Sequence, residues 1–128
     1  MKAIIQEEPK VVELKDGEVV FGTVEEITSW AVGARQADVT RITLTGPDFV
    51  HINNRTEETY IYESGRGKIL LGNEIFEFNP GTRVIIPPGT LHAAKPYDSF
   101  PQFVFLRVAS PPFDPEDVFY PDPRGRNW

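Results

Sequence analysis

The sequence contains no cysteine, which excludes disulfides, thiolate metal sites and a cysteine nucleophile. No apolar run approaches the roughly 20 residues that a membrane-spanning helix needs, so we expect no contact with a membrane. The first residues become acidic too early for a secretory signal peptide. Together these absences favour a cytoplasmic protein.

Positive charge is also scarce, because 13 Lys and Arg residues face 19 Asp and Glu residues, for a formal net charge of -6. This balance argues against binding to the phosphate backbone of a nucleic acid. The chain has 128 residues, of which 40% are hydrophobic and 25% charged, a composition typical of a globular protein. We therefore expect one domain spanning residues 1–128.

Hydrophobic periodicity indicates strands almost throughout, and no stretch has a convincing helical period; residues 23–34 are ambiguous. The glycines of segment 64–67 suit a hairpin or a bulge between two of these strands. Short strands with regular turn signals predict an all-β sandwich or barrel. The expected strands cover residues 18–24, 39–45, 59–63, 68–71, 74–78, 82–86 and 102–108.

Ten of the twelve prolines lie from Pro80 onward, and several of them interrupt the C-terminal tail at 110–128. Proline removes backbone donors, so the tail cannot form a central strand. Its aromatic residues are nevertheless too numerous for a solvated linker. We expect the tail to wrap around the barrel or to pack on a second subunit.

The two histidines, His51 and His92, have informative surroundings. In an extended segment residues i and i+2 share a face, so His51 and Asn53 point the same way. By the same rule Glu58 shares a face with Tyr60 and Tyr62, and pairing of the two segments across the turn at 55–57 would bring these faces together. His92 follows a rigid Pro-Pro-Gly turn, which delivers it at the start of a strand.

Two stretches, at about 46–65 and 81–96, resemble the two sequence motifs of the cupin superfamily. The first motif is matched by a His-x-Asn segment, four residues, a glutamate, six residues and a glycine, at His51, Asn53, Glu58 and Gly65. The second is matched at Gly81, Pro87, Gly89 and His92. Three positions depart from the pattern: Asn53 replaces a histidine, Pro96 replaces an asparagine, and Gly46 is displaced by one residue. The resemblance implies a single-domain cupin barrel, that is, a jelly roll or double-stranded β-helix.

The same resemblance implies a metal site. The positions that bind metal in cupins correspond here to His51, Glu58 and His92, with Asn53 in the place of the fourth ligand. Two imidazoles and a carboxylate suit iron, manganese, nickel or zinc. The amide oxygen of Asn53 is a weaker ligand than an imidazole, so we expect a lower affinity than in a cupin with four ligands.

Three functions are compatible with this sequence, all involving a small-molecule ligand inside the barrel. The first is a metal-dependent enzyme, an oxygenase, isomerase or lyase, acting on a small polar or oxygenated substrate. The second is a metal-free isomerase or epimerase, in which His51 or His92 acts as base and Tyr60 as acid beside Glu58. The third is a binding module for a sugar or an acid, without turnover.

Four further residues stand out from their surroundings in the sequence. Arg41 and Arg107 lie within otherwise apolar strands; an outer-face charge is the favoured position for both, and either one would be an anion anchor if it pointed inward. Tyr62 is expected to pack in the core, and Trp30 either covers one barrel mouth or is a buried anchor. The apolar segment around Val11 and the aromatic tail indicate a homodimer.

Overall fold

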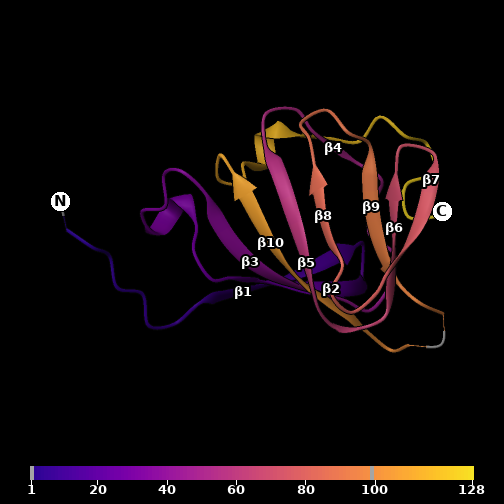
Figure 1. Ribbon diagram of the computed structural model, residues 1–128, viewed down its shortest axis with the longest axis horizontal. Helices are drawn as coiled ribbons and strands as arrows, with labels where there is room; N and C mark the ends of the chain where they lie inside the picture. Colours follow the sequence, from indigo (N-terminus) through magenta and orange to yellow (C-terminus); the bar gives the residue numbers. More distant parts are fainter. Residues whose placement is uncertain (1, 99) are drawn as a thin grey trace.

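The computed structural model describes residues 2–98 and 100–128 of the chain (Figure 1). Across these residues the all-β expectation is confirmed, because the regular structure consists of strands and two short 3-10 turns. No helix in this part of the chain is long and apolar enough to cross a membrane. The elements are β1 Lys10–Asp16, β2 Val19–Glu26, η1 Trp30–Val32, β3 Asp38–Leu44, β4 Ile52–Asn53, β5 Glu57–Gly65, β6 Gly67–Leu71, β7 Glu74–Phe78, β8 Arg83–Ile86, β9 His92–Pro96, β10 Phe103–Ser110, η2 Pro115–Asp117 and β11 Val118–Phe119.

The strands form three antiparallel sheets (Figure 1). The largest has the order β1-β2-β3-β10-β5-β8, a three-stranded sheet has the order β7-β6-β9, and β4 pairs with β11. Residues from both larger sheets contribute to one hydrophobic cluster, so this cluster fills the space between the sheets. The arrangement is that of a jelly roll.

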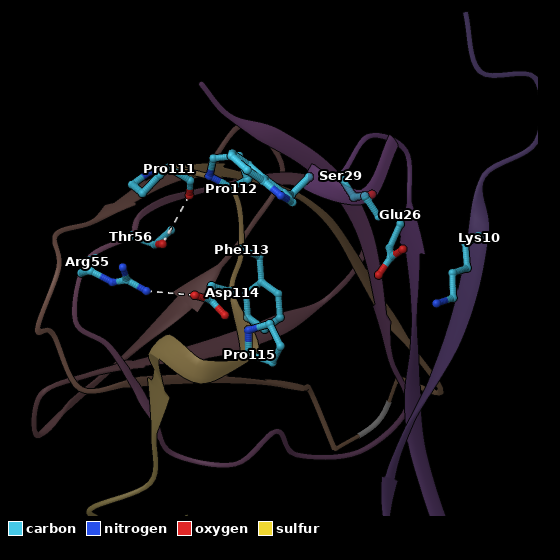
Figure 2. Close-up of a pocket in the computed structure, with 12 residues that line it drawn as sticks. Lys10, Glu26, Ser29, Arg55, Thr56, Pro111, Pro112, Phe113, Asp114 and Pro115 are labelled. Atoms are coloured by element: carbon cyan, nitrogen blue, oxygen red, sulfur yellow. Dashed lines mark hydrogen bonds and ion pairs between the residues drawn. The ribbon is translucent and has the colours of Figure 1, made fainter. Parts of the chain in front are cut away.

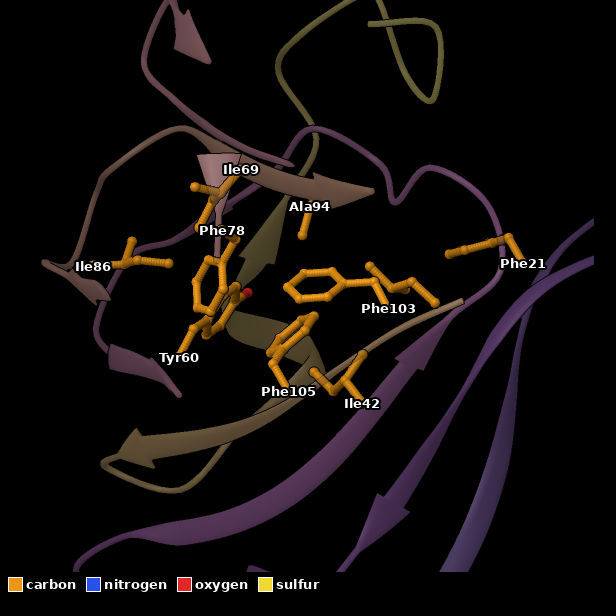
Figure 3. Packing of buried hydrophobic residues seen from close by; sticks show 10 residues of the cluster. Phe21, Ile42, Tyr60, Ile69, Phe78, Ile86, Ala94, Phe103 and Phe105 are labelled. Carbon is orange, nitrogen blue, oxygen red and sulfur yellow. The ribbon is translucent and has the colours of Figure 1, made fainter. Parts of the chain in front are cut away.

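Side-chain alternation along β10 determines what the barrel contains. Phe103 and Phe105 point inward and are almost completely buried, and they stack with Phe78 and Tyr60 in an aromatic core (Figure 3). The next inward position on the same strand is Arg107, which is 9% exposed. The barrel interior is therefore apolar along the first half of β10 and polar along the second half.

Two expected strand pairings differ in the structure. Segment 64–67 is not a hairpin turn, because β5 and β6 belong to different sheets and the chain crosses between them there. An irregularity of the register between β5 and β10 does occur nearby, at Val104 and Phe105. The segment with His51 and Asn53 does not pair with β5; instead β4 pairs with β11 of the tail.

The tail packs on the barrel, as one of the two expected alternatives stated. The segment 110–119, here called the strap, runs across one end of the barrel. Its backbone is held by side chains of the barrel: the amide of Phe113 donates to Asp38 Oδ2 at 2.7 Å, and Thr56 Oγ1 donates to the carbonyl of Pro111 at 3.3 Å. In return, Asp117 of the strap accepts from the amide of Arg55 at 2.9 Å.

The two larger sheets pack so closely at Gly67 that adding a methyl group there should destabilise the protein. A Cβ on Gly67 would overlap with the ring of Phe103. We expect Gly67→Ala to lower the free energy of unfolding by about 1–3 kcal/mol, because it overpacks the core. Chemical denaturation checks this, with the exposed Glu74→Ala on the paired strand as a control. Phe103→Leu should recover part of the loss in the double variant, and additive effects would contradict the steric explanation.

Candidate functional site

The polar half of the barrel is built by three neighbouring strands of the large sheet. On the inner face Arg107 of β10 lies between Thr40 of β3 and Tyr60 of β5 in the strand register. The next inner row places Ala109 between Asp38 and Glu58. The small side chain of Ala109 separates two buried carboxyl groups, and this row lies beneath the strap.

The two histidines reach this region from the opposite side. The backbones of His51 and His92 exchange hydrogen bonds of 3.0 and 2.9 Å, and their ring centroids are 4.2 Å apart. Gly89, in the turn before His92, has a φ of 80°, a left-handed conformation that favours glycine. Its amide donates to the carbonyl of Asn53, which ties the turn to β4. His51 and Asn53, which were expected to share a face, are both buried.

Both imidazoles are held in a defined orientation. His51 Nδ1 lies 2.7 Å from the carbonyl oxygen of Phe49, and His92 Nδ1 lies 2.8 Å from that of Thr90. A carbonyl oxygen only accepts, so each Nδ1 carries a proton and each Nε2 is left for the barrel interior. One ligand atom each from His51, Glu58 and His92 lies within 4.8 Å of the others. The structure thus brings together three of the expected site residues with the donor set of a metal centre.

Glu58 is the centre of this cluster and is only 1% exposed. Its Oε1 lies 2.9 Å from His92 Nε2, and its Oε2 lies 3.4 Å from Arg107 Nε. Burial opposes ionisation of the carboxyl group and is the largest single influence on its pKa. The hydrogen bond with His92 and the charge of Arg107 together outweigh burial, so the pKa of Glu58 lies below its usual value.

His51 has the opposite tendency. Burial is the main reason that its pKa lies below the ordinary value, and the nearby His92 adds to the effect. Asp48 acts against this shift, with Oδ2 at 3.8 Å from His51 Nδ1. A neutral imidazole with a free Nε2 is the form that a metal ion or a proton from a substrate requires.

Asn53 is only 2% exposed. Among the described residues, neither its amide nitrogen nor its amide oxygen has a hydrogen-bond partner. Buried amides are nearly always paired in proteins, and an unpaired one marks a place for water, an ion or a ligand. The position that a histidine ligand occupies in cupins is thus filled by a free amide.

Tyr60 lies at the boundary between the aromatic core and the cluster. Its ring contacts Phe105, with centroids 4.5 Å apart, and meets the ring of His92 edge-on at 6.1 Å. Burial raises the pKa of its hydroxyl well above the usual range. Tyr62 packs against the core as expected, and its hydroxyl donates to the carbonyl of Gly65.

The two strand arginines have different environments. Arg41 points outward and pairs with Glu25 and Glu63, each at 2.7 Å. The outer-face position expected for Arg107 is wrong: it is buried and faces Glu58, so of the two arginines it alone fulfils the condition for an anion anchor. Trp30 is neither buried nor packed in the core; it is 56% exposed and lines a surface pocket.

Several residues of the site were not identified from the sequence. Asp38 and Thr40 face the interior from β3, whose register the pattern alone does not determine. Phe113 of the strap places its ring 4.6 Å from the guanidinium carbon of Arg107. Tyr120 lies 6.2 Å from the ring of His51, measured between centroids. The alternation Asp38, Thr40, Ile42, Leu44 was the available signal for β3, whereas no local signal places the tail.

A pocket of about 660 Å³ opens beside the strap (Figure 2). Its walls come from β1, β2, η1, the loop before β5 and the strap itself. Figure 2 shows Phe113 and Asp114 of the strap between Arg55 on one side and Glu26 on the other. The size is typical of small-molecule sites. We call it the strap pocket.

Comparisons with known proteins agree with this architecture. No family model matches the chain. An uncharacterized protein of Methanocaldococcus jannaschii, MJ1618, is 35% identical over 69 residues, which are 54% of this chain and 54% of that protein. The matched part of the chain thus spans about half the length of this curated relative.

Solved structures are similar over most of the chain. Pac13 of Streptomyces, described as a nucleoside dehydratase, is 20% identical with a TM-score of 0.69, covering 94% of this chain and 90% of its own. A protein of Planctomyces limnophilus is 20% identical with a TM-score of 0.74, covering 94% and 97%. A Klebsiella pneumoniae protein with a double-stranded β-helix domain is 19% identical with a TM-score of 0.64, covering 79% and 84%.

The fold and the comparisons together define an all-β jelly-roll protein. More specifically, this chain has the double-stranded β-helix fold of the cupin superfamily. Its two sequence motifs supply His51, Glu58 and His92 to a cluster that is able to hold a metal ion.

The environment of Glu58 predicts a pH-dependent contribution to stability. In chelator-treated protein, we expect Glu58→Gln to cost on the order of 3 kcal/mol at pH 7, because the charge of Arg107 then stays buried without its partner. The folded-state pKa of Glu58 is depressed, so the contribution is present above the ordinary value of 4.5 and is lost as pH falls through the folded value. The difference from wild type should therefore shrink below about pH 4.5.

Urea unfolding between pH 3 and pH 8 measures this difference. Glu57→Gln is the matched control, because Glu57 is adjacent in sequence but exposed. A constant difference across the pH range would show that Glu58 is not ionised in the folded protein.

Proposed function

We propose that this protein is a metal-dependent enzyme that binds a small polar or oxygenated molecule inside the barrel. The observation that carries the proposal is the buried group of His51, Glu58 and His92, whose ligand atoms lie within 4.8 Å of one another. The Nδ1 atoms of both histidines are bonded to backbone carbonyls, so each histidine has its Nε2 as the remaining ligand atom, and that of His92 is bonded to Glu58 until a metal replaces the shared proton. Iron, manganese, nickel and zinc are all compatible with this donor set.

The residues also fit such an ion in other respects. The unpaired amide of Asn53 gives a fourth, weaker donor on the same face as His51. A bound divalent ion would supply Lewis-acid chemistry, or, if it is iron, oxygen chemistry. Tyr60, beside His92, is in a position to hydrogen-bond a substrate, and the aromatic core behind it excludes water.

A metal-free acid–base function is the second candidate, and the bond between His92 Nε2 and Glu58 Oε1 favours it. One proton must lie between these two atoms, because both would otherwise be acceptors. His51 or His92 would act as base and Tyr60 as acid in an isomerase or epimerase. Pac13, with the same fold, is described as a nucleoside dehydratase, and Tyr→Phe and His→Gln variants of it have been solved with uridine. Exchange of substrate protons with deuterated solvent would distinguish this function from a sugar- or acid-binding module without turnover.

Elemental analysis of protein purified without chelator tests the metal proposal. We expect about one equivalent of transition metal per chain, lost in Glu58→Ala and His92→Ala and retained in Glu57→Ala. Asn53→His should tighten binding, because an imidazole is the stronger ligand for these metals. Iron would favour an oxygenase, and zinc or manganese an isomerase or lyase. Absence of metal after reconstitution with iron, manganese, nickel and zinc would contradict the proposal.

We also propose a homodimer, supported by the exposed apolar side chains of β1 and β2. Val11 is 62% and Val19 is 55% exposed, and β1 is one of the two edge strands of the large sheet, the other being β8. Such an edge is open to pairing with another chain.

Size-exclusion chromatography with light scattering at micromolar concentration checks the dimer. We expect a species of twice the 14.5 kDa chain mass and dissociation in the Val11→Lys, Val19→Lys double variant. Ile85→Lys, at an exposed apolar site on β8, is the control and should remain dimeric. A wild-type protein of 14.5 kDa would refute this proposal.

A further inference from the structure

The polar half of the barrel contains more buried polar atoms than it can satisfy. Among the described residues, Arg107 Nε and both amide atoms of Asn53 lack a hydrogen-bond partner. One oxygen each on Asp38, Thr40 and Glu58 also lacks a hydrogen-bond partner, although Glu58 Oε2 and Arg107 Nε face each other as an ion pair at 3.4 Å. Strand register places Asp38, Thr40, Glu58 and Arg107 on the inner face of three adjacent strands. An unsatisfied group of this kind is costly unless something else binds there.

A continuous series of contacts leads from the strap pocket to this region. Phe113 lines the pocket, and its ring centroid lies 4.6 Å from the guanidinium carbon of Arg107. Arg107 Nε lies 3.4 Å from Glu58 Oε2, and Glu58 Oε1 lies 2.9 Å from His92 Nε2. Phe113 belongs to the strap, so a strap side chain contacts both the pocket and Arg107.

Charge determines what kind of ligand fits. The charged residues of the pocket wall lie beside residues of opposite charge. Arg55 forms an ion pair with Asp114 at 2.9 Å, and Lys10 is the cross-strand neighbour of Glu26. Among the described residues Arg107 forms its one ion pair with Glu58, which also bonds His92, while the charge of Arg107 is also felt by the nearby carboxyl group of Asp38. A guanidinium is a planar fork that matches a carboxylate. A dianion such as a phosphate is disfavoured there by the buried carboxyl groups of Asp38 and Glu58.

We propose that the strap pocket and Arg107 form one ligand site for a small organic carboxylate, whose charged end binds Arg107 and whose apolar body lies against Phe113 and Trp30. The site takes its substrate through the strap end of the barrel. This inference rests on the proposed function for where the chemistry occurs, but carboxylate binding itself requires no metal.

Calorimetric titration of the full chain in the presence of chelator tests this site, with benzoate, the neutral isostere benzamide, and phenyl phosphate as probes. We expect benzoate to bind at least about tenfold more tightly than the other two, because one charge-assisted fork distinguishes them. Arg107→Lys should weaken benzoate by about tenfold and leave benzamide unchanged. Arg41→Lys, on the outer face, should change neither.

The outcomes separate this inference from the metal proposal. Equal binding of benzoate and benzamide, tighter binding of phenyl phosphate, or no binding of benzoate at millimolar concentration would overturn it, and these comparisons need no variant. Benzoate binding that Arg107→Lys leaves intact in folded protein would also overturn it. Selective benzoate binding by a protein that binds no metal would contradict only the metal proposal.

Stopped-flow fluorescence in a Trp128→Phe background, where Trp30 is the remaining tryptophan, tests the path past Phe113. We expect Phe113→Ala to raise the association rate constant for benzoate, because the ring no longer covers Arg107. Phe119→Ala is the control, since Phe119 lies on the same tail but is 47% exposed and does not line the pocket. Equal rates for the two variants would show that Phe113 does not obstruct the site.

Discussion

A buried carboxylate between a histidine and an arginine is the constraint on which the site depends. Glu58 is almost inaccessible to water, and an isolated carboxylate in such a place would protonate or unfold the protein. His92 and Arg107 each approach one of its oxygens, so the charge is compensated from two strands, β9 and β10. Any change in one of the three groups alters the electrostatic environment of the other two.

Because Glu58 needs a buried cation beside it, the interior of the barrel has an aromatic part and a polar part. Phe103 and Phe105 precede Arg107 at intervals of two residues on β10, so a single strand contributes both the aromatic core and the cation. Ala109, the next inner residue, is small enough to leave space between Asp38 and Glu58. The core therefore provides stability at one end, and the polar end retains unsatisfied groups that only a ligand, an ion or water is able to satisfy.

Much of this could be predicted from the sequence because the information is local. Alternation identified β2, β3, β5 and β10, and the spacing of His51, Glu58 and His92 in two motifs identified the cluster. The inward position of Asn53 followed from the period of two in a strand. These predictions depend on residues a few positions apart, which backbone geometry constrains directly.

What the sequence did not predict depends on contacts between distant segments. The pairing of β4 with β11 joins residues more than 60 positions apart, and nothing in the segment around Asn53 distinguishes β11 from β5 as its partner. The same holds for Asp38, whose carboxylate accepts from the amide of Phe113 in the strap. Proline indicated only that the tail is not a central strand. The contact between the tail and Arg107, made by Phe113, is apparent only in the folded structure.

The geometry of His92 finally limits how the cluster is used. Its Nδ1 donates to the carbonyl of Thr90, so Nε2 is the only nitrogen that a metal ion or an acid–base reaction is able to use. In the structure this atom faces Glu58 Oε1, with one proton between them. Binding of a metal requires that this proton leave the site, whereas acid–base catalysis requires that Nε2 exchange a proton with the substrate, giving one up as acid or taking one up as base. Both candidate functions use the same lone pair on His92 Nε2. A protein with metal bound at this atom therefore cannot use His92 as an acid or a base at the same time.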